Sequence, residues 1–355
     1  MANDQAHNTA TEDPNERATP DVTAVVAAVT AASGTGISSI SGDFAPGNTL
    51  TIAGASLGTT GNSVINDDFE DGTVGNNLNT RVWNTTSANG PPVPVVTDTD
   101  AFAGTKCGLA DCSVGGDSSA YVDSLDTEEV YISIALKALL VSGSPTTTKG
   151  VRVHGDAGPN IFTRYPGFMD QEPFDDTSGN SRRLQINPDD ASNTNDDSTF
   201  YIGGDSLASG EWYREEYYFK HSTPGGSDGI FQLRQDGDFI VNQTALTTRL
   251  SGITAKMAVI HMPFYWGNGG GGKWFYDLVS ITKGPGCLAR FEAADSADWS
   301  AKTKSEILWT SARSDTAATV DVPGATTFTS GETVYIFAIG ADDAPIGNAV
   351  SMEVQ

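Results

Sequence analysis

Residues 37–58 have the sequence ISSISGDFAPGNTLTIAGASLG. Apolar and polar residues alternate on both sides of the turn Pro46-Gly47-Asn48, so this stretch predicts two short β-strands. Matching strand-like sequences appear only near the other end of the chain, over residues 319–323, 331–338 and 347–354. The two chain ends are therefore predicted to fold together into one small β-sandwich that carries a larger inserted domain.

The lengths of the segments agree with this organisation. Residues 36–66 and 284–355 together amount to roughly the 100 residues of one immunoglobulin-like sandwich. Residues 67–283 have a length that is usual for a single all-β domain, and they contain many strand-like runs with almost no helical periodicity. Residues 1–35 are predicted to be a flexible arm that ends in a short Val/Ala docking segment.

The first strand pair carries a family resemblance. Its motif consists of Ile37, Ile40, Pro46-Gly47, Thr49, Thr51-Ile52, Gly54 and Leu57-Gly58. This motif resembles the start of the IPT/TIG family of immunoglobulin-like domains, and residues 331–354 resemble the closing strands of that family. Family members are normally continuous, whereas this chain is interrupted.

The insert is similar to concanavalin A-like, carbohydrate-binding jelly rolls. The resemblance rests on four segments in the expected order, namely residues 67–72, 210–220, 228–238 and 274–281. It implies an all-β fold class, in which an immunoglobulin-like sandwich holds an inserted concanavalin A-like jelly-roll sandwich. Lectins, lyases, hydrolases and phage fibre proteins share this fold, so the fold does not name an activity.

Charge and composition restrict the function. The chain has 45 acidic and 20 basic residues among 355, which gives a net charge of −25. Such a surface repels nucleic acids and anionic lipids, and no apolar stretch is long enough to span a membrane. The sequence is rich in Thr, Ser, Gly, Asn and Asp, as extracellular proteins are, but its start has no export signal. A virion component would combine these two properties, and a secreted protein whose signal has been removed is the alternative.

Carboxylates gather where the insert begins. Asp67, Asp68, Glu70 and Asp71 follow one another, and the jelly-roll resemblance brings Asp277 beside them. Hard carboxylate oxygens suit Ca²⁺. The resemblance implies a structural Ca²⁺ held by Asp68, Glu70 and Asp277, and the alternative is an acidic edge in contact with solvent.

The three cysteines leave two possibilities open. Cys107 and Cys112 enclose four residues, so a small disulfide-closed loop is one expectation, and two free, partly buried thiols are the other. Cys287 has no partner in either case.

A glycan-binding face is predicted from aromatic and basic residues. Tyr265 and Trp266 precede a glycine-rich loop, which places them at a flexible loop end. We expect sugar-binding residues in a concave sheet, and the candidates are Tyr265, Trp266, Trp212, Tyr165, Arg152 and His154. The alternative is that most of these aromatic side chains fill the sandwich interior.

Catalysis is not predicted. Arg152 and His154 share one face of a strand, and with His261, Tyr265 and Glu215 they could form a lyase-like acid/base site. These positions do not reproduce a lyase motif, and neither a retaining-hydrolase pair nor a Gly-x-Ser-x-Gly elbow is present.

The resulting prediction is a surface protein of a tailed virus, either a capsid decoration or a fibre component, and not an enzyme. It would form a homo-oligomer, with a trimer favoured, and would contact viral capsid or tail proteins and a cell-surface glycan. Nucleic acid and membrane insertion are not expected. The alternative is a secreted polysaccharide lyase or glycoside hydrolase, or its carbohydrate-binding module.

Overall fold

The computed structural model describes residues 35–88, 92–113, 117–140, 151–155, 168–172, 181–187, 199–205, 209–249, 251–252, 254, 256–262 and 272–355. Gly34–Gln355 form one compact unit. The predicted arm and docking segment lie outside the described residues, apart from residue 35.

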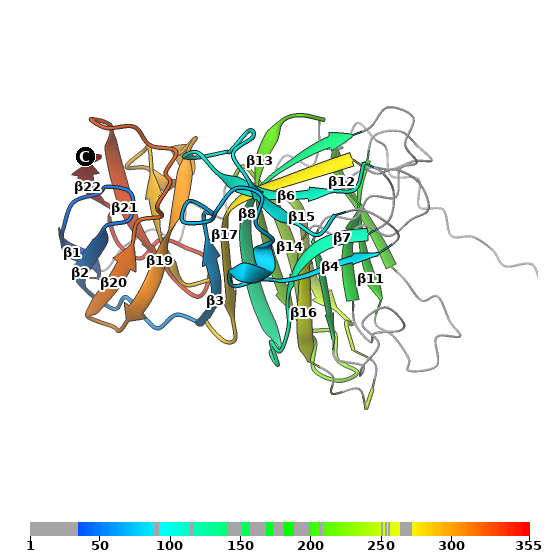
Figure 1. Cartoon of the computed structure of the whole chain (residues 1–355). Helices are drawn as coiled ribbons and strands as arrows, with labels where there is room; N and C mark the ends of the chain where they lie inside the picture. Colours follow the sequence, from blue (N-terminus) through cyan, green and yellow to red (C-terminus); the bar gives the residue numbers. More distant parts are fainter. Residues whose placement is uncertain are drawn as a thin grey trace, which may run out of the picture. The chain divides into compact units, whose positions relative to one another are not determined.

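One sheet unites the two ends of the chain. Its strand order is β1-β2-β20-β19-β18-β21-β22, and Figure 1 shows the first strands, in blue, beside the last ones, in orange and red. The strands are β1 (Gly36–Ser41), β2 (Thr49–Ala55), β18 (Arg290–Ala294), β19 (Ser305–Arg313), β20 (Ala317–Asp321), β21 (Thr333–Ile339) and β22 (Val350–Glu353).

The alternating sequence of β2 explains its position in this sheet. Leu50 and Ile52 are buried, whereas Thr49 and Thr51 are exposed, as expected for a strand with one face on the core. Leu50 lies opposite Val320 of β20, and both belong to the sandwich core. The predicted pairing of the two chain ends in an all-β fold is thus confirmed.

The insert forms two further sheets. One has the order β12-β11-β10-β9-β16-β7-β4, and the other has the order β15-β14-β13-β8-β17-β6-β5, with β3 paired to β17. The bounds are β3 (Asn62–Asp67), β4 (Asn84–Ala88), β5 (Val95–Thr97), β6 (Cys107–Asp111), β7 (Asp117–Val122), β8 (Glu129–Leu140), β9 (Arg152–Gly155), β10 (Phe168–Glu172), β11 (Ser181–Asn187), β12 (Thr199–Asp205), β13 (Trp212–Lys220), β14 (Gly229–Gln235), β15 (Asp238–Leu246), β16 (Met257–Met262) and β17 (Gly272–Lys283).

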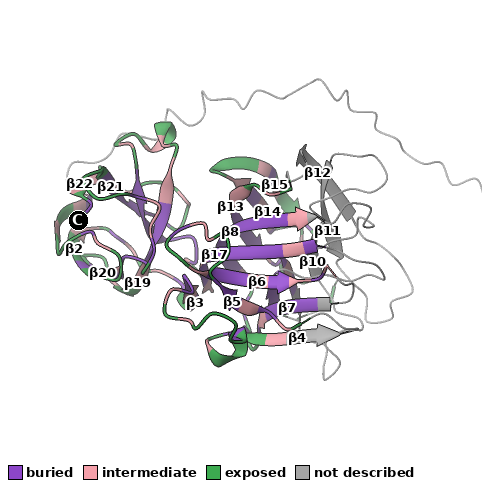
Figure 2. Ribbon diagram, turned by 45° about the horizontal axis from the view of Figure 1, so that its top comes forward, coloured by how far each residue is buried: buried purple, intermediate pink, exposed green. Residues whose placement is uncertain are grey.

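The two insert sheets pack face to face. Val122 and Ile260 of the first sheet share one apolar core with Ile132, Ile134 and Tyr276 of the second. Figure 2 shows β8 and β17 buried along most of their length. The predicted jelly-roll sandwich is therefore confirmed.

Helical structure is minor in the described part of the chain. Two short 3₁₀ turns are present among the described residues, η1 (Leu78–Thr80) and η2 (Trp299–Ala301). No helix in the described part of the chain is long and apolar enough to cross a membrane.

The insert leaves and re-enters the sandwich through neighbouring strands. β3 pairs with the end of β17, with Asn62 opposite Lys283 and Asp67 opposite Val279. Because the first and last strands of the insert are adjacent, the insert adds little loop-closure entropy to the folding of the sandwich.

An apolar contact joins the sandwich to the jelly roll. Tyr131 and Tyr218, from β8 and β13, form one buried cluster with Leu288 and Ile307 of the sandwich side. The sandwich therefore covers part of the outer face of the sheet that contains β8 and β13.

Charged residues surround this apolar contact. Arg290 donates to Glu292 at 2.5 Å and to Asp343 at 2.7 Å. Arg214 of β13 lies 3.3 Å from Glu292, and Arg234 of β14 lies 2.5 Å from Asp343. Burial alone would raise the pKa of Glu292, but Arg290 and Arg214 lower it to about 2. The network thus holds ionised groups from both domains in a buried position.

Glu306 is the group at this contact that is not neutralised. Its side chain is 3% exposed. Oε2 accepts hydrogen bonds from Thr326 Oγ1 and from Thr327 N, both at 2.9 Å, while Oε1 has no hydrogen-bond partner among the described residues. Burial raises the pKa of Glu306 to about 7, although the threonine hydrogen bonds and Arg214 oppose this shift.

We predict that Glu306 makes stability depend on pH. Its pKa rises from 4.5 in the unfolded chain to about 7 in the folded protein. The stability that Glu306 contributes is therefore complete below pH 4.5 and is lost as the pH rises through 7. A Glu306→Gln variant should not show this decrease in the free energy of unfolding, which is on the order of 3 kcal/mol. Urea unfolding on both sides of this pH window measures the effect. The exposed Glu353→Gln serves as the matched control, and equal pH profiles for the unmodified chain and Glu306→Gln would refute the prediction.

Candidate functional site

Three polar side chains lie opposite one another on neighbouring strands of the sheet that contains β7, β16 and β9. His261 of β16 pairs with Tyr121 of β7 on one side and with Arg152 of β9 on the other. Directly opposed residues share one face of a sheet, so this register brings Tyr121, His261 and Arg152 together. The cluster comes from three segments that are far apart in the sequence.

These side chains point away from the jelly-roll core. Val122, Ile260 and Val153, the sequence neighbours of the three residues, are buried in that core. Since successive side chains of a strand point to opposite faces, Tyr121, His261 and Arg152 lie on the outer face. We call this set, together with Ser119, the outer-face cluster.

Stacking and hydrogen bonding fix the middle of the outer-face cluster. The rings of Tyr121 and His261 are stacked, with centroids 5.2 Å apart and planes at 28°. Ser119 Oγ lies 3.2 Å from His261 Nδ1, and both of these residues are 1% exposed. Tyr121 and Arg152 are half-buried, so they form the accessible part of the cluster.

The protonation of Tyr121 follows from its surroundings. Burial raises the pKa of Tyr121, and the negative charge of Asp123 adds to this effect. A phenol with a raised pKa keeps its proton at neutral pH, so Tyr121 is present as a donor, but the shift itself makes it a weaker acid.

Polar residues continue along the same row of the sheet. In the register, Asn84 of β4 stands opposite Tyr121, and Asp170 of β10 stands opposite Arg152. The row therefore crosses five adjacent strands, from β4 to β10, and it is long enough to accommodate several units of an extended chain molecule.

The structure separates the residues that the sequence predicted to bind a glycan. Arg152 belongs to the outer-face cluster, but Trp212 belongs to β13 in the other insert sheet, where its ring lies 5.5 Å from that of Phe102. His154 lies in β9, opposite Val259 in the register, and its side chain is outside the described part of the structure. Tyr165, Tyr265 and Trp266 lie outside the described residues.

Glu215 does not join His261. It lies in β13, is 0% exposed and accepts a hydrogen bond from the hydroxyl of Tyr217. The interior position of Tyr217 and Trp274 agrees with the alternative that aromatic side chains fill the sandwich.

Sequence reasoning missed Ser119 and Tyr121. The signal was present, because Ser119 and Tyr121 alternate with Ala120 and Val122 as expected for a half-buried strand. The run is short and is flanked by polar residues, so it did not stand out from the surrounding loops.

Two of the carboxylates that were expected to hold Ca²⁺ accept hydrogen bonds from backbone N–H groups of the chain. Asp277 Oδ2 accepts from the N–H groups of Phe102 and Ala103, both at 3.1 Å. Glu70 Oε1 accepts from the N–H groups of Thr105 and Lys106, both at 2.7 Å. One loop, residues 102–106, therefore contacts both carboxylates.

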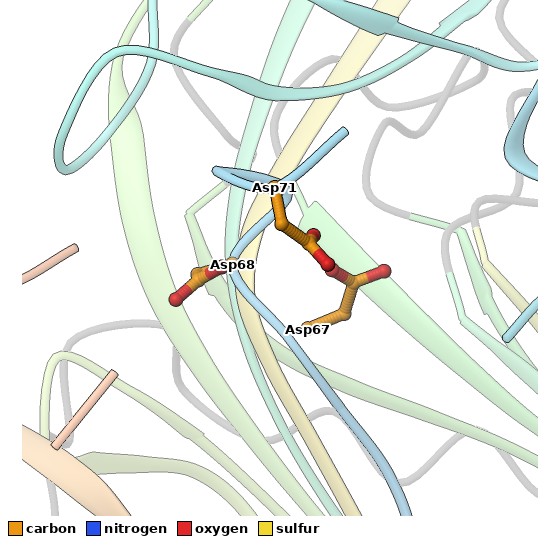
Figure 3. A group of neighbouring side chains, drawn as sticks. All are labelled: Asp67, Asp68 and Asp71. Carbon is orange, nitrogen blue, oxygen red and sulfur yellow. The ribbon is translucent and has the colours of Figure 1, made fainter. Parts of the chain in front are cut away.

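Asp67, Asp68 and Asp71 form the described acidic group whose oxygens lie within 4.8 Å of one another. Figure 3 shows the Asp71 side chain pointing toward Asp67 and the Asp68 side chain pointing to the other side. Arg81 forms ion pairs with Asp67 and Asp71, and Trp83 Nε1 donates to Asp67 at 2.8 Å. Asp67 is thus already neutralised within the chain.

Asp68 and Asp277 are the carboxylates whose buried negative charge a bound cation would stabilise. Burial raises the pKa of Asp277 to about 8, and Asp68 adds to the shift. Burial also raises the pKa of Asp68, against the hydrogen bonds that it accepts from the N–H groups of Glu70 and Gly324. The oxygen donors have the chemistry that Ca²⁺ prefers, so a site formed by Asp68, Glu70 and Asp277 stays a prediction.

If Ca²⁺ binds there, it should stabilise the fold. Ca²⁺ at about 100 times its dissociation constant is expected to add about 2.7 kcal/mol to the free energy of unfolding. Thermal unfolding with Ca²⁺ and with a chelator measures this difference. The Asp277→Asn variant should lose the response, whereas Asp228→Asn, at an exposed position, should keep it. An unmodified chain that unfolds identically in both solutions would contradict the prediction.

The predicted disulfide between Cys107 and Cys112 is wrong. All three cysteines are free and buried. Residues 107–111 form β6, in which Leu109 and Ala110 pair with β17, and do not form a loop. Five residues of extended strand separate the two ends by about 16 Å, whereas a disulfide needs Cα atoms within about 7 Å.

Comparison with known proteins finds weak likenesses to solved structures only. No family model matches the chain, and no curated protein matches it. Endo-β-1,4-glucuronan lyase from the fungus Trichoderma reesei matches 63% of this chain and 96% of its own, with 12% identity and a TM-score of 0.43. Alginate lyase vAL-1 from Chlorella virus matches 57% and 93%, with 14% identity and a TM-score of 0.38. The cellulose-induced protein Cip1 matches 61% and 96%, with 14% identity and a TM-score of 0.39.

These comparisons correct one prediction and leave another open. At identities of 10–17% the likeness concerns the fold alone. Several of the similar solved structures are polysaccharide lyases, so the prediction that the chain is not an enzyme is withdrawn; at TM-scores below 0.5 the likeness itself carries no argument for an activity. The IPT/TIG resemblance stays a prediction.

Proposed function

We propose that this chain is a carbohydrate-active jelly roll that cleaves an acidic polysaccharide by β-elimination. The observation that supports the proposal is the row formed by Tyr121, His261 and Arg152 on the outer face of one insert sheet. It combines a proton donor, a proton acceptor and a fixed cation, the three groups that an elimination next to a carboxylate requires.

Each residue has a defined role in the reaction. Arg152 pairs with the carboxylate of a uronic acid unit and stabilises the negative charge that develops when the neighbouring carbon loses its proton. His261 accepts that proton. The electron pair of the broken C–H bond forms a carbon–carbon double bond, and the bond to the glycosidic oxygen breaks. Tyr121 then donates its phenolic proton to the leaving oxygen.

The exposure of the three side chains determines which of them the substrate contacts first. Tyr121 and Arg152 are half-buried and meet the substrate first, whereas His261 is 1% exposed. A sugar unit therefore reaches His261 after the side chains of this face rearrange around it, as interface side chains commonly do.

The net charge of the protein affects how the experiment is run. A chain with a net charge of −25 repels a polyanion at long range. Salt screens this repulsion beyond about 8 Å at physiological ionic strength but leaves the close contact with Arg152 intact. The assay is therefore run at moderate to high salt.

The test is incubation of the purified chain with polyglucuronate, alginate and pectate. Elimination creates an unsaturated uronate that absorbs ultraviolet light, together with one new reducing end per cut. New reducing ends without the absorbance would show hydrolysis and overturn the proposal. Binding without any cut would also overturn it and would favour a carbohydrate-binding module.

The virion-surface role stays a prediction. Copurification with virus particles at a fixed stoichiometry would support it. The described residues provide no observation that favours it over the enzyme.

A further inference from the structure

Ser119 is a buried member of the outer-face cluster and has two polar neighbours. It precedes Tyr121 by two residues in β7, so both side chains point to the outer face. Ser119 Oγ lies 3.1 Å from the carbonyl oxygen of Ala120 and 3.2 Å from His261 Nδ1. Ser119 is 1% exposed, so water contributes little to this arrangement.

The number of available protons determines the direction of each hydrogen bond. A serine hydroxyl has one proton, and a carbonyl oxygen can only accept. If Ser119 donates to Ala120 O, its Oγ accepts a hydrogen bond from the Nδ1–H group of His261, and both contacts are hydrogen bonds. If Ser119 donated to Nδ1 instead, Ser119 Oγ and Ala120 O would face each other at 3.1 Å with no proton between them. The first arrangement makes hydrogen bonds of both contacts of Ser119 Oγ.

We infer that Ser119 is a positioning residue that holds neutral His261 with its proton on Nδ1 and its lone pair on Nε2. In a neutral imidazole one nitrogen donates and the other accepts, and the partner of one nitrogen decides the role of the other. The consequence for catalysis rests on the proposed function, in which His261 takes a proton from the substrate. Nε2 is then the atom that receives it.

The test reads the tautomer directly by NMR of ¹⁵N-labelled imidazole. The chain has four histidines, and the signals of His261 are identified by their loss in a His261→Gln variant. In the unmodified chain at a pH where His261 is neutral, we expect a protonated Nδ1 and an unprotonated Nε2. Ser119→Ala should shift the proton partly or fully to Nε2, and Ser119→Thr, which keeps the hydroxyl, should preserve the original pattern.

Two spectra would overturn the inference. One is an unmodified chain in which Nε2 carries the proton, a result that needs no variant to fold. The other is an unchanged pattern in Ser119→Ala. Because the spectra are recorded without substrate, they test the tautomer even if no polysaccharide is cleaved.

Activity provides the second readout. If the chain cleaves a polysaccharide, Ser119→Ala should lower kcat about 10-fold, in proportion to the lost fraction of the productive tautomer, and leave KM nearly unchanged. Ser119→Thr should restore kcat. A loss of kcat in Ser119→Ala without a change of tautomer would indicate a merely structural role and refute the inference.

Discussion

A Tyr121→Phe variant is expected to cleave an acidic polysaccharide at least about 100-fold more slowly than the unmodified chain, because a general acid contributes 100- to 10,000-fold to such a reaction. The substitution removes only the phenolic oxygen. The ring that stacks on His261 at 5.2 Å remains, so the outer-face cluster keeps its packing. Initial rates of ultraviolet absorbance at saturating substrate measure the effect, and kcat should fall while KM changes little.

The matched control is Tyr335→Phe. Tyr335 is half-buried in β21 of the sandwich and lies outside the outer-face cluster. Its loss of a hydroxyl should leave the rate unchanged. Equal rates for Tyr121→Phe and the unmodified chain would remove Tyr121 from the reaction, and a new acid would have to be sought in the same row.

The second large effect is expected at the contact between the sandwich and the jelly roll. Arg290→Ala removes the cation that contacts Glu292 at 2.5 Å and Asp343 at 2.7 Å, and that lies 4.8 Å above the ring of Tyr131. Breaking a buried ion pair by removing one partner typically costs about 3–5 kcal/mol, because the other charge stays buried. Chemical denaturation at neutral pH measures this loss of stability.

The shape of the unfolding curve adds a second criterion. The unmodified chain is expected to unfold in one transition, because the buried network and its apolar cluster link the two domains. Arg290→Ala should separate this into two transitions. The control is Lys256→Ala, whose ion pair with Asp126 is exposed and should contribute about 0–1 kcal/mol. A change of similar size in both variants would mean that the buried network does not couple the domains.

Much of the fold could be predicted from local patterns. Alternation in residues 37–58 indicated strands with one buried face, and residues 331–338 indicated a further strand. The structure places β2 and β21, which arise from these segments, in one sheet. The dipeptide Asp236-Gly237 is typical of a two-residue hairpin turn, and in the structure it joins β14 to β15. These features depend on neighbouring residues or on a period of two residues, so they can be recognised in the sequence itself.

Pairing between distant strands could not be predicted in the same way. Because side chains alternate along a strand, the sequence placed Arg152 and His154 on one face of β9. The local sequence did not specify that β16 and β7 would follow β9 in the sheet. The stack of Tyr121 on His261 depends on that long-range register. The error at Cys107 has the same origin, because pairing with β17 makes a strand of a segment whose glycine and aspartate suggested a loop.

The adjacency of β3 and β17 makes the two domains separable in principle. Asn62 pairs with Lys283, and Gly61 N donates to Gly286 O at 3.1 Å, so the chain crosses between the domains at a single narrow point. A short turn joining these positions would give an uninterrupted sandwich, provided that the charges of the contact were replaced. Any other domain whose termini are neighbours could be grafted at the same point, which makes the sandwich a scaffold for building chimeric proteins.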